Sequence, residues 1–184
     1  MHRWRQQVTA GLSGSVVEIG FGSGLNVGHY PPEVRQVWAV EPAAVARRLA
    51  ERRIAQAGVN VDHVGLAGES LPLGDRSCDA ALSTFTLCTV RDPVAVLAEL
   101  RRVLVVGGRF HFLEHGIAPD PPVARWQHRL EPLQRRFADN CHLTRDPAEL
   151  VAASGMRIES VEQRYARGPR PWSWFTIGVA VNDA

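Results

Sequence analysis

The sequence predicts an α/β fold with a seven-stranded, mostly parallel sheet and helices on both faces. Short apolar runs alternate with amphipathic helical segments along the chain, which is the pattern of parallel strands joined by helical crossovers. The last two apolar runs, Ile158–Gln163 and Phe175–Val181, are joined by a connection too short for a helical crossover. The final strand is therefore expected to be antiparallel and to lie between the fifth strand and Ile158–Gln163.

The first elements follow from apolar runs and the residues that interrupt them. The first strand, Ser15–Ile19, runs into a glycine-rich turn, and a short helix is expected from that turn to about Tyr30. Two prolines follow and end it, because a residue before proline is driven out of the helical region. The second strand is Val37–Val40, and the helix Ala43–Ala57 after it is ended by Gly58.

The remaining elements are read in the same way. Strands three to five are predicted at Val59–Val64, Ala80–Ser83 and Arg109–Leu113. Asp92 is suited to cap a helix that has Pro93 at its first position. That helix is expected to pack on the sheet through residues at helical spacing, namely Val94, Leu97, Leu100 and Leu104, and to be broken by Gly107-Gly108. Two further helices are expected, an amphipathic one within 119–137 and a short one at Pro147–Ser154.

Composition excludes several classes of protein. The 184 residues suit one domain, residues 15–184, preceded by a short N-terminal segment, residues 1–14. A net charge of +2 does not favour a nucleic-acid partner. All 21 basic residues are arginine, so Schiff-base and phosphate-loop lysines are excluded.

No apolar stretch approaches the ~20 residues of a membrane span. The three cysteines show no metal-ligand spacing, and no metal is expected; the protein is expected to be cytoplasmic.

Polar residues and glycines, together with a few apolar neighbours, lie at the carboxyl ends of the first five predicted strands. This is the edge where open α/β sheets bind ligands. Strand by strand, they are Glu18, Gly20, Phe21, Gly22, Ser23, Gly24 and Asn26; Glu41 with Pro42; Gly68, Glu69 and Ser70; Ser83, Thr84, Phe85 and Thr86; and Glu114 with His115. An acid that ends the second strand can accept hydrogen bonds from both hydroxyls of a ribose.

Both nicotinamide dinucleotides and S-adenosylmethionine have a ribose that such an acid can bind. A dinucleotide fingerprint has the spacing GxGxxG, whereas the turn at Gly20 reads GxGxG. Glu18 lies inside the first strand, where an unpaired buried carboxylate is costly. Amides of the glycine-rich loop could satisfy the Glu18 carboxylate. The ammonium group of a bound methionine moiety could also do so, through those amides or through water. A diphosphate would gain nothing from the negative charge of Glu18. A nicotinamide-dependent oxidoreductase is therefore the less favoured alternative.

These motifs resemble those of the class I S-adenosylmethionine-dependent methyltransferases (methyltransferase type 11 family), which implies a Rossmann-like fold. Glu18–Gly24 resembles their first motif, Glu41 their ribose-binding acid, and Gly68–Pro72 the loop that holds the adenine edge. Leu104–Arg109 resembles their LxPGG turn, with Val106 where proline is usual. The resemblance implies S-adenosylmethionine as cofactor and methyl transfer to a small molecule as activity; a non-catalytic, cofactor-binding protein is a second alternative.

One branch, the methyltransferase-like proteins that methylate alkyl thiols in animals, is similar over nearly the whole chain. The shared segments are Asn26–Pro32, Thr86–Val90, Phe112–His115 and Cys141–Arg145. They imply a thiol or another soft nucleophile as acceptor, with His115 as the candidate base beside Glu114. The alternative is a purely structural role, in which His115 forms hydrogen bonds that stabilise its loop. Cys141 is interpreted as a packed residue. Phe85, Leu87, Trp126 and Trp172 are expected to wall the acceptor pocket. Relatives of this branch carry a membrane anchor in a longer N-terminal region, and no integral membrane segment is expected here.

Overall fold

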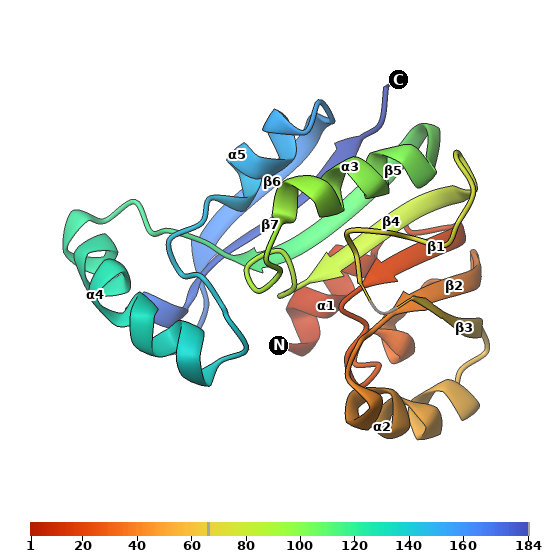
Figure 1. Ribbon diagram of the computed structural model, residues 1–184, viewed down its shortest axis with the longest axis horizontal. Helices are drawn as coiled ribbons and strands as arrows, with labels where there is room; N and C mark the ends of the chain where they lie inside the picture. The colour runs from red at the N-terminus through yellow and green to blue at the C-terminus, as the bar shows by residue number, and fades with distance from the viewer. Residues whose placement is uncertain (66, 184) are drawn as a thin grey trace.

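A computed structural model describes residues 1–65 and 67–183 of the chain. Within these residues the strands form one seven-stranded sheet in the order β3-β2-β1-β4-β5-β7-β6 (Figure 1). The strands are β1 (Gly14–Ile19), β2 (Val34–Val40), β3 (Asn60–Gly65), β4 (Cys78–Thr84), β5 (Leu104–His115), β6 (Arg157–Tyr165) and β7 (Trp174–Val181). The predicted fold class is confirmed.

The sheet is parallel except at β7. This strand pairs antiparallel with β5 on one side and with β6 on the other. The predicted insertion of the last strand is therefore confirmed. The strand order reverses between β1 and β4, so the connections leave these two neighbours in opposite directions, and the carboxyl ends of β1 and β4 border the crevice where such sheets bind ligands.

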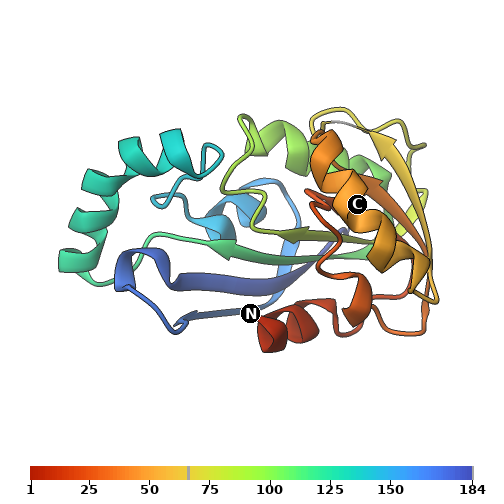
Figure 2. The same cartoon turned by 90° about the horizontal axis from the view of Figure 1, so that it is seen from below.

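Helices cover both faces of the sheet. On one face, α3 (Pro93–Val103) and α5 (Pro147–Ala153) pack on a buried cluster that includes Ile19, Phe110 and Phe112. On the other face, α1 (His2–Thr9) and α2 (Ala44–Ala55) pack on a cluster that includes Val16 and Leu113. Figure 2 shows α1 and α3 on opposite sides of the sheet. Each face thus buries an apolar layer, which stabilises an open sheet from both sides.

The longest helix, α4 (Pro121–Phe137), extends beyond the sheet instead of covering it (Figure 1). Its inner side is anchored by the buried side chain of Gln127, which accepts a hydrogen bond from the Ala118 amide and donates to the carbonyls of Gly116 and Pro171. The 3-10 turn η2 (Arg170–Trp172) lies against it. Among the described residues, no helix combines the length and the apolar character that crossing a membrane requires.

Some predicted elements were wrong in detail. The N-terminal segment contains α1, which was not predicted, and the glycine turn leads into turns and the 3-10 helix η1 (Val27–His29) in place of an α-helix. Asp92 caps α3 as predicted, since its Oδ1 accepts the Ala95 amide at 2.9 Å. Val94, however, is 66% exposed, because the sheet-facing stripe of α3 begins at Val96. Gly107-Gly108 lies inside β5, so the helix ends earlier than predicted.

Candidate active site

The glycine turn after β1 lies against the loop after β4. Gly20 has a φ of +64°, and a Cβ at this position would come within 1.9 Å of the Thr86 hydroxyl oxygen. That hydroxyl donates a hydrogen bond to the Ile19 carbonyl at 3.3 Å. Only glycine fits both the left-handed backbone and the close approach. The two loops therefore form adjoining walls at the carboxyl edge of the sheet.

A cavity of about 570 Å³ opens between these loops. Its size lies in the range of small-ligand sites. Its walls come from the ends of β1, β2 and β4, from the segment after β3, and from the segment after α4. The lining residues are Ile19, Gly20, Val40, Glu41, Pro42, Ala67, Gly68, Glu69, Thr84, Phe85, Thr86, Thr89, Val90, Arg91, Asp139 and Asn140.

Strained backbone gathers at this cavity. Of the four non-glycine residues with positive φ in the described chain, three line it: Phe85 at +56°, Asp139 at +48° and Asn140 at +60°. Such conformations persist only where surrounding contacts impose them, and they are concentrated at functional sites. Phe85 is fixed by its amide, which donates to the Leu113 carbonyl at 2.8 Å.

Glu41 ends β2 with a buried carboxylate on the cavity wall. Its Oε2 accepts the Gly22 amide at 2.7 Å, and its Oε1 accepts the Ala43 amide at 2.8 Å. A carboxylate oxygen can accept a second hydrogen bond, so Glu41 retains capacity for ligand hydroxyls. The same carboxylate also orders the glycine turn. Arg47 of α2 holds the strand end through a 2.6 Å hydrogen bond to the Glu41 carbonyl.

Glu18 is fully buried inside β1. Side chains satisfy it, in place of the loop amides expected from sequence: Asn26 donates to Oε1 at 2.7 Å, and the Tyr30 hydroxyl donates to Oε2. Burial raises the pKa of Glu18 to about 7, although the hydrogen bonds from Tyr30 and Asn26 and the nearby Arg5 charge act in the opposite direction. Glu18 thus changes charge near neutral pH.

Arg5 of α1 completes this network. Its Nη1 donates to Asn26 Oδ1 at 2.7 Å and lies 3.4 Å from the Thr84 hydroxyl. A helix that packs on the far face of the sheet therefore reaches the ligand-binding edge. Sequence reasoning missed this contact because residues 1–14 were treated only as a lead-in; Trp4 and Val8, four positions apart, were the available helical signal.

Glu114, near the end of β5, is also fully buried. It accepts hydrogen bonds from the Ser83 hydroxyl at 2.6 Å, the Thr86 amide at 3.1 Å and the Cys88 amide at 3.2 Å. Burial raises its pKa, and these hydrogen bonds partly oppose the shift. Successive side chains of a strand point to opposite faces, so Glu114, which the sequence placed beside His115, points away from it and orders the loop after β4.

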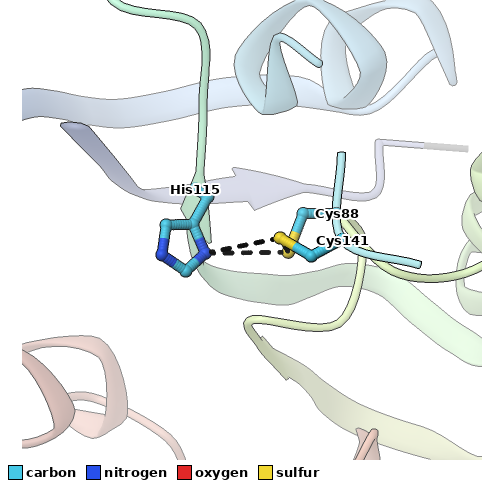
Figure 3. Close-up of side chains that lie close together, drawn as sticks. All are labelled: Cys88, His115 and Cys141. Atoms are coloured by element: carbon cyan, nitrogen blue, oxygen red, sulfur yellow. Dashed lines mark hydrogen bonds between the residues drawn. The ribbon is translucent and has the colours of Figure 1, made fainter. Parts of the chain in front are cut away.

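His115, the last residue of β5, lies among aromatic rings and sulfur atoms. Its ring is 4.9 Å from that of Phe85 and 5.0 Å from that of Phe175, between ring centroids. Its Nδ1 is 3.9 Å from the sulfur of Cys88 and 3.9 Å from that of Cys141 (Figure 3). His115 does not itself line the cavity, but it contacts Phe85, which does.

Cys88 and Cys141 contact each other through their sulfur atoms. Their sulfurs are 3.6 Å apart and share a hydrogen bond. This bond lowers the pKa of Cys141 to about 5, against the opposing effect of burial and with help from His115. It raises the pKa of Cys88, which burial raises further. Cys141 is buried as the sequence suggested, but its polar contacts were not foreseen.

Comparison with known proteins identifies the family. Residues 17–112, more than half of the chain, match the methyltransferase domain family. The chain belongs to this methyltransferase family. Thiol S-methyltransferase TMT1B of Homo sapiens is 35% identical over 91% of this methyltransferase and 69% of its own length, and that of Rattus norvegicus is 32% identical over 89% and 67%. A solved structure from Bacillus halodurans superposes with a TM-score of 0.81 at 13% identity, covering 98% of this chain and 97% of its own.

The methyltransferase uses S-adenosylmethionine as its methyl donor and transfers the methyl group to a small molecule. The residues fit that cofactor: Glu41 presents spare acceptor capacity for hydroxyls, and the turn at Gly20 has the open, left-handed backbone that a close ligand requires. Both alternatives, the nicotinamide-dependent oxidoreductase and the non-catalytic protein, are set aside by the family. When bound, S-adenosylmethionine supplies a methyl group already activated by its sulfonium.

The predicted cofactor residues divide into two groups in the methyltransferase. Seven line the cavity: Gly20, Glu41, Pro42, Gly68, Glu69, Thr84 and Phe85. The others do not line it: Glu18, Phe21, Gly22, Ser23, Gly24, Asn26 and Ser70. Members of the second group support the turn. The Ser23 carbonyl accepts Arg53 of α2 at 2.7 Å, and the ring of Phe21 is buried and lies 5.6 Å from that of His63.

The predicted walls of the acceptor pocket were mostly wrong. Phe85 lines the cavity. Leu87 is buried in the core, because the loop after β4 turns its side chain inward. Trp126 is 55% exposed on the outer side of α4, and the Trp172 indole donates to Gln134 at 2.9 Å. These side chains were assigned from residue type alone, and the direction in which α4 extends could not be read from the sequence.

Proposed function

We propose that this methyltransferase methylates small alkyl thiols, with His115 as its catalytic residue on the acceptor side. The observation that carries the proposal is an imidazole set against the rings of Phe85 and Phe175 at the edge of the cofactor cavity. Apolar walls with a few polar groups suit a small, largely apolar nucleophile. The names of the human and rat relatives, thiol S-methyltransferases, support the same class of acceptor.

The protein has two tasks in this reaction. The aromatic rings align the acceptor and exclude water, which raises the rate by orientation. A thiol with a pKa of ~8.5 is only a few per cent ionised at pH 7, so proton removal helps. Nδ1 of His115 faces the two sulfurs, which leaves Nε2 as the nitrogen that accepts the proton from the acceptor thiol.

The proposal includes the domain bounds, the cofactor-binding residues, the partner and the cellular compartment. The domain comprises residues 15–184, and residues 1–14 pack on it through α1. The cofactor-binding set is the one predicted from sequence, and the seven of its residues that line the cavity support it. The partner is a small molecule and not a nucleic acid. The three cysteines are free thiols, which suits a reducing compartment such as the cytoplasm.

Release of S-adenosylhomocysteine, measured across alkyl thiols, phenols and amines, tests the proposal. We expect alkyl thiols to be the best acceptors. His115→Ala should lower turnover by about 10²–10⁴-fold and leave S-adenosylmethionine affinity nearly unchanged. His128→Ala, on the exposed side of α4, is the matched control and should retain the wild-type rate. A phenol or an amine used far better than every thiol would refute the thiol assignment.

A further inference from the structure

Three metal-binding atoms converge beside the cofactor cavity. Cys88 lies in the loop after β4, His115 ends β5, and Cys141 lies between α4 and α5 (Figure 3). Sγ of Cys88, Sγ of Cys141 and Nδ1 of His115 form a closed triangle with edges of 3.6, 3.9 and 3.9 Å. Segments far apart in sequence thus place two sulfurs and one imidazole nitrogen on a common centre.

The triangle has the dimensions of one face of a metal coordination shell. Tetrahedral zinc, with Zn–S of about 2.3 Å and Zn–N of about 2.0–2.1 Å, separates two thiolates by about 3.8 Å and a thiolate from an imidazole nitrogen by about 3.6 Å. The centre of the triangle, in the plane of the three atoms, lies about 2.2 Å from each of them. The two Sγ–Nδ1 edges exceed the tetrahedral value by about 0.3 Å, a difference that a small side-chain rotation closes.

We propose that Cys88, His115 and Cys141 form a binding site for a thiophilic divalent cation, Zn²⁺ above all. Thiolate and imidazole ligands favour zinc and disfavour the hard cations Mg²⁺ and Ca²⁺. Three protein ligands with an open fourth position are typical of catalytic zinc sites, whereas structural sites are closed by four. Among the described residues, no further cysteine, histidine or carboxylate joins this group.

The supporting contacts hold the ligands in place. Glu114 accepts the Cys88 amide at 3.2 Å, and the His142 amide donates to the Cys88 carbonyl at 2.7 Å, which ties the two cysteine segments together. Asn140 adds a second tie, because its side chain donates to the Thr89 carbonyl at 2.9 Å. These contacts fix the backbone of the two segments that carry the cysteine ligands.

The open position gives the ion a role in the proposed reaction, and this step rests on the proposed function. The neighbours of the ligands in sequence, Thr89 and Asn140, line the cavity, as does Phe85 against the His115 ring. The acceptor thiol binds at the fourth position as a thiolate, displaces a water molecule and gives its proton to solvent. In the metal-loaded chain the ion acidifies the thiol; in the metal-free chain Nε2 of His115 accepts the proton.

Cobalt titration of the metal-free chain tests the site, because Co²⁺ reports thiolate ligation by near-ultraviolet charge-transfer absorption. We expect saturation at one equivalent and displacement by Zn²⁺. Cys88→Ser and Cys141→Ser should bind Co²⁺ at least tenfold more weakly. Cys78→Ala, which alters the cysteine outside the cluster, should bind as the wild type does. An alkyl thiol added to the cobalt-loaded chain should shift the spectrum.

Alkylation provides a measurement that does not depend on any variant folding. One equivalent of Zn²⁺ should slow the alkylation of Cys88 and Cys141 in the wild-type chain at least tenfold. No charge-transfer band together with no protection would overturn the site.

The proposed function fails separately from the metal site. Thiol methylation at equal rates with and without metal, with a cobalt spectrum that thiols do not change, overturns the role of the fourth position and leaves the methylation of thiols intact. A cobalt spectrum that thiols shift, in a chain that methylates none of them, supports the site and refutes the proposed acceptor.

Discussion

Replacement of Glu18 by glutamine should remove a pH-dependent cost that burial of this carboxyl imposes on the folded chain. The folded-state pKa is about 7, against 4.5 for the free carboxyl. Below pH 4.5 both states are protonated and no cost arises. As pH rises from 4.5 to 7 the unfolded state releases its proton first, so the folded state becomes progressively less stable. The shift of about 2.5 pH units corresponds to a loss of about 3 kcal/mol.

Urea unfolding between pH 5 and 8 measures this difference. The stability of Glu18→Gln relative to wild type should rise by roughly 1.4 kcal/mol per pH unit up to about pH 7 and then level off. Comparison of the two proteins cancels the contribution of Glu114, whose raised pKa acts in the same direction. Glu51→Gln, exposed on α2, is the control and should follow the wild type. A stability difference independent of pH would refute the reasoning.

Three further predictions concern the cofactor edge. Glu41→Ala removes an acceptor worth about 1.5–3 kcal/mol per hydrogen bond, so calorimetry should show S-adenosylmethionine affinity reduced at least tenfold, and unchanged affinity would contradict the ribose role. Gly20→Ala creates a contact of 1.9 Å at a positive φ, so its thermal midpoint should fall by several degrees, whereas Gly58→Ala, with open space around it, should not. Arg5→Ala should weaken cofactor binding about tenfold through the loss of its charged hydrogen bond. The exposed Arg3→Ala should have no such effect.

Much of the fold could be predicted because its signals are local. The apolar runs set β1 to β7, and the short connection between Gln163 and Phe175 required the antiparallel insertion of β7. Glu41 was placed correctly for the same reason, since a strand end and a following proline are visible in the sequence. Residues at the carboxyl ends of strands could be assigned to the ligand-binding edge of the sheet, because that edge is where open α/β sheets bind ligands.

What could not be predicted depends on segments that meet only in the folded chain. Cys88, His115 and Cys141 are separated by 27 and 26 positions, and no spacing rule joins a loop, a strand end and an interhelical segment. Glu114 and His115 were grouped because they are adjacent in sequence, although strand alternation turns them to opposite faces. The reach of Arg5 to Asn26 likewise depends on how α1 docks, which amphipathic spacing does not specify.

The contacts of Glu114 have a consequence for motion. Its carboxylate accepts hydrogen bonds from the hydroxyl of Ser83 in β4 and from the amides of Thr86 and Cys88 in the following loop. Those amides should exchange with deuterium only through openings that also expose the buried Glu114 side chain, which are rare. We therefore expect this wall to open less often than the rest of the cavity rim. Admission of a ligand then depends on fluctuations elsewhere in the cavity wall, such as the segment around Gly68 and Glu69, and slow exchange confined to the β4 side would be the signature of that asymmetry.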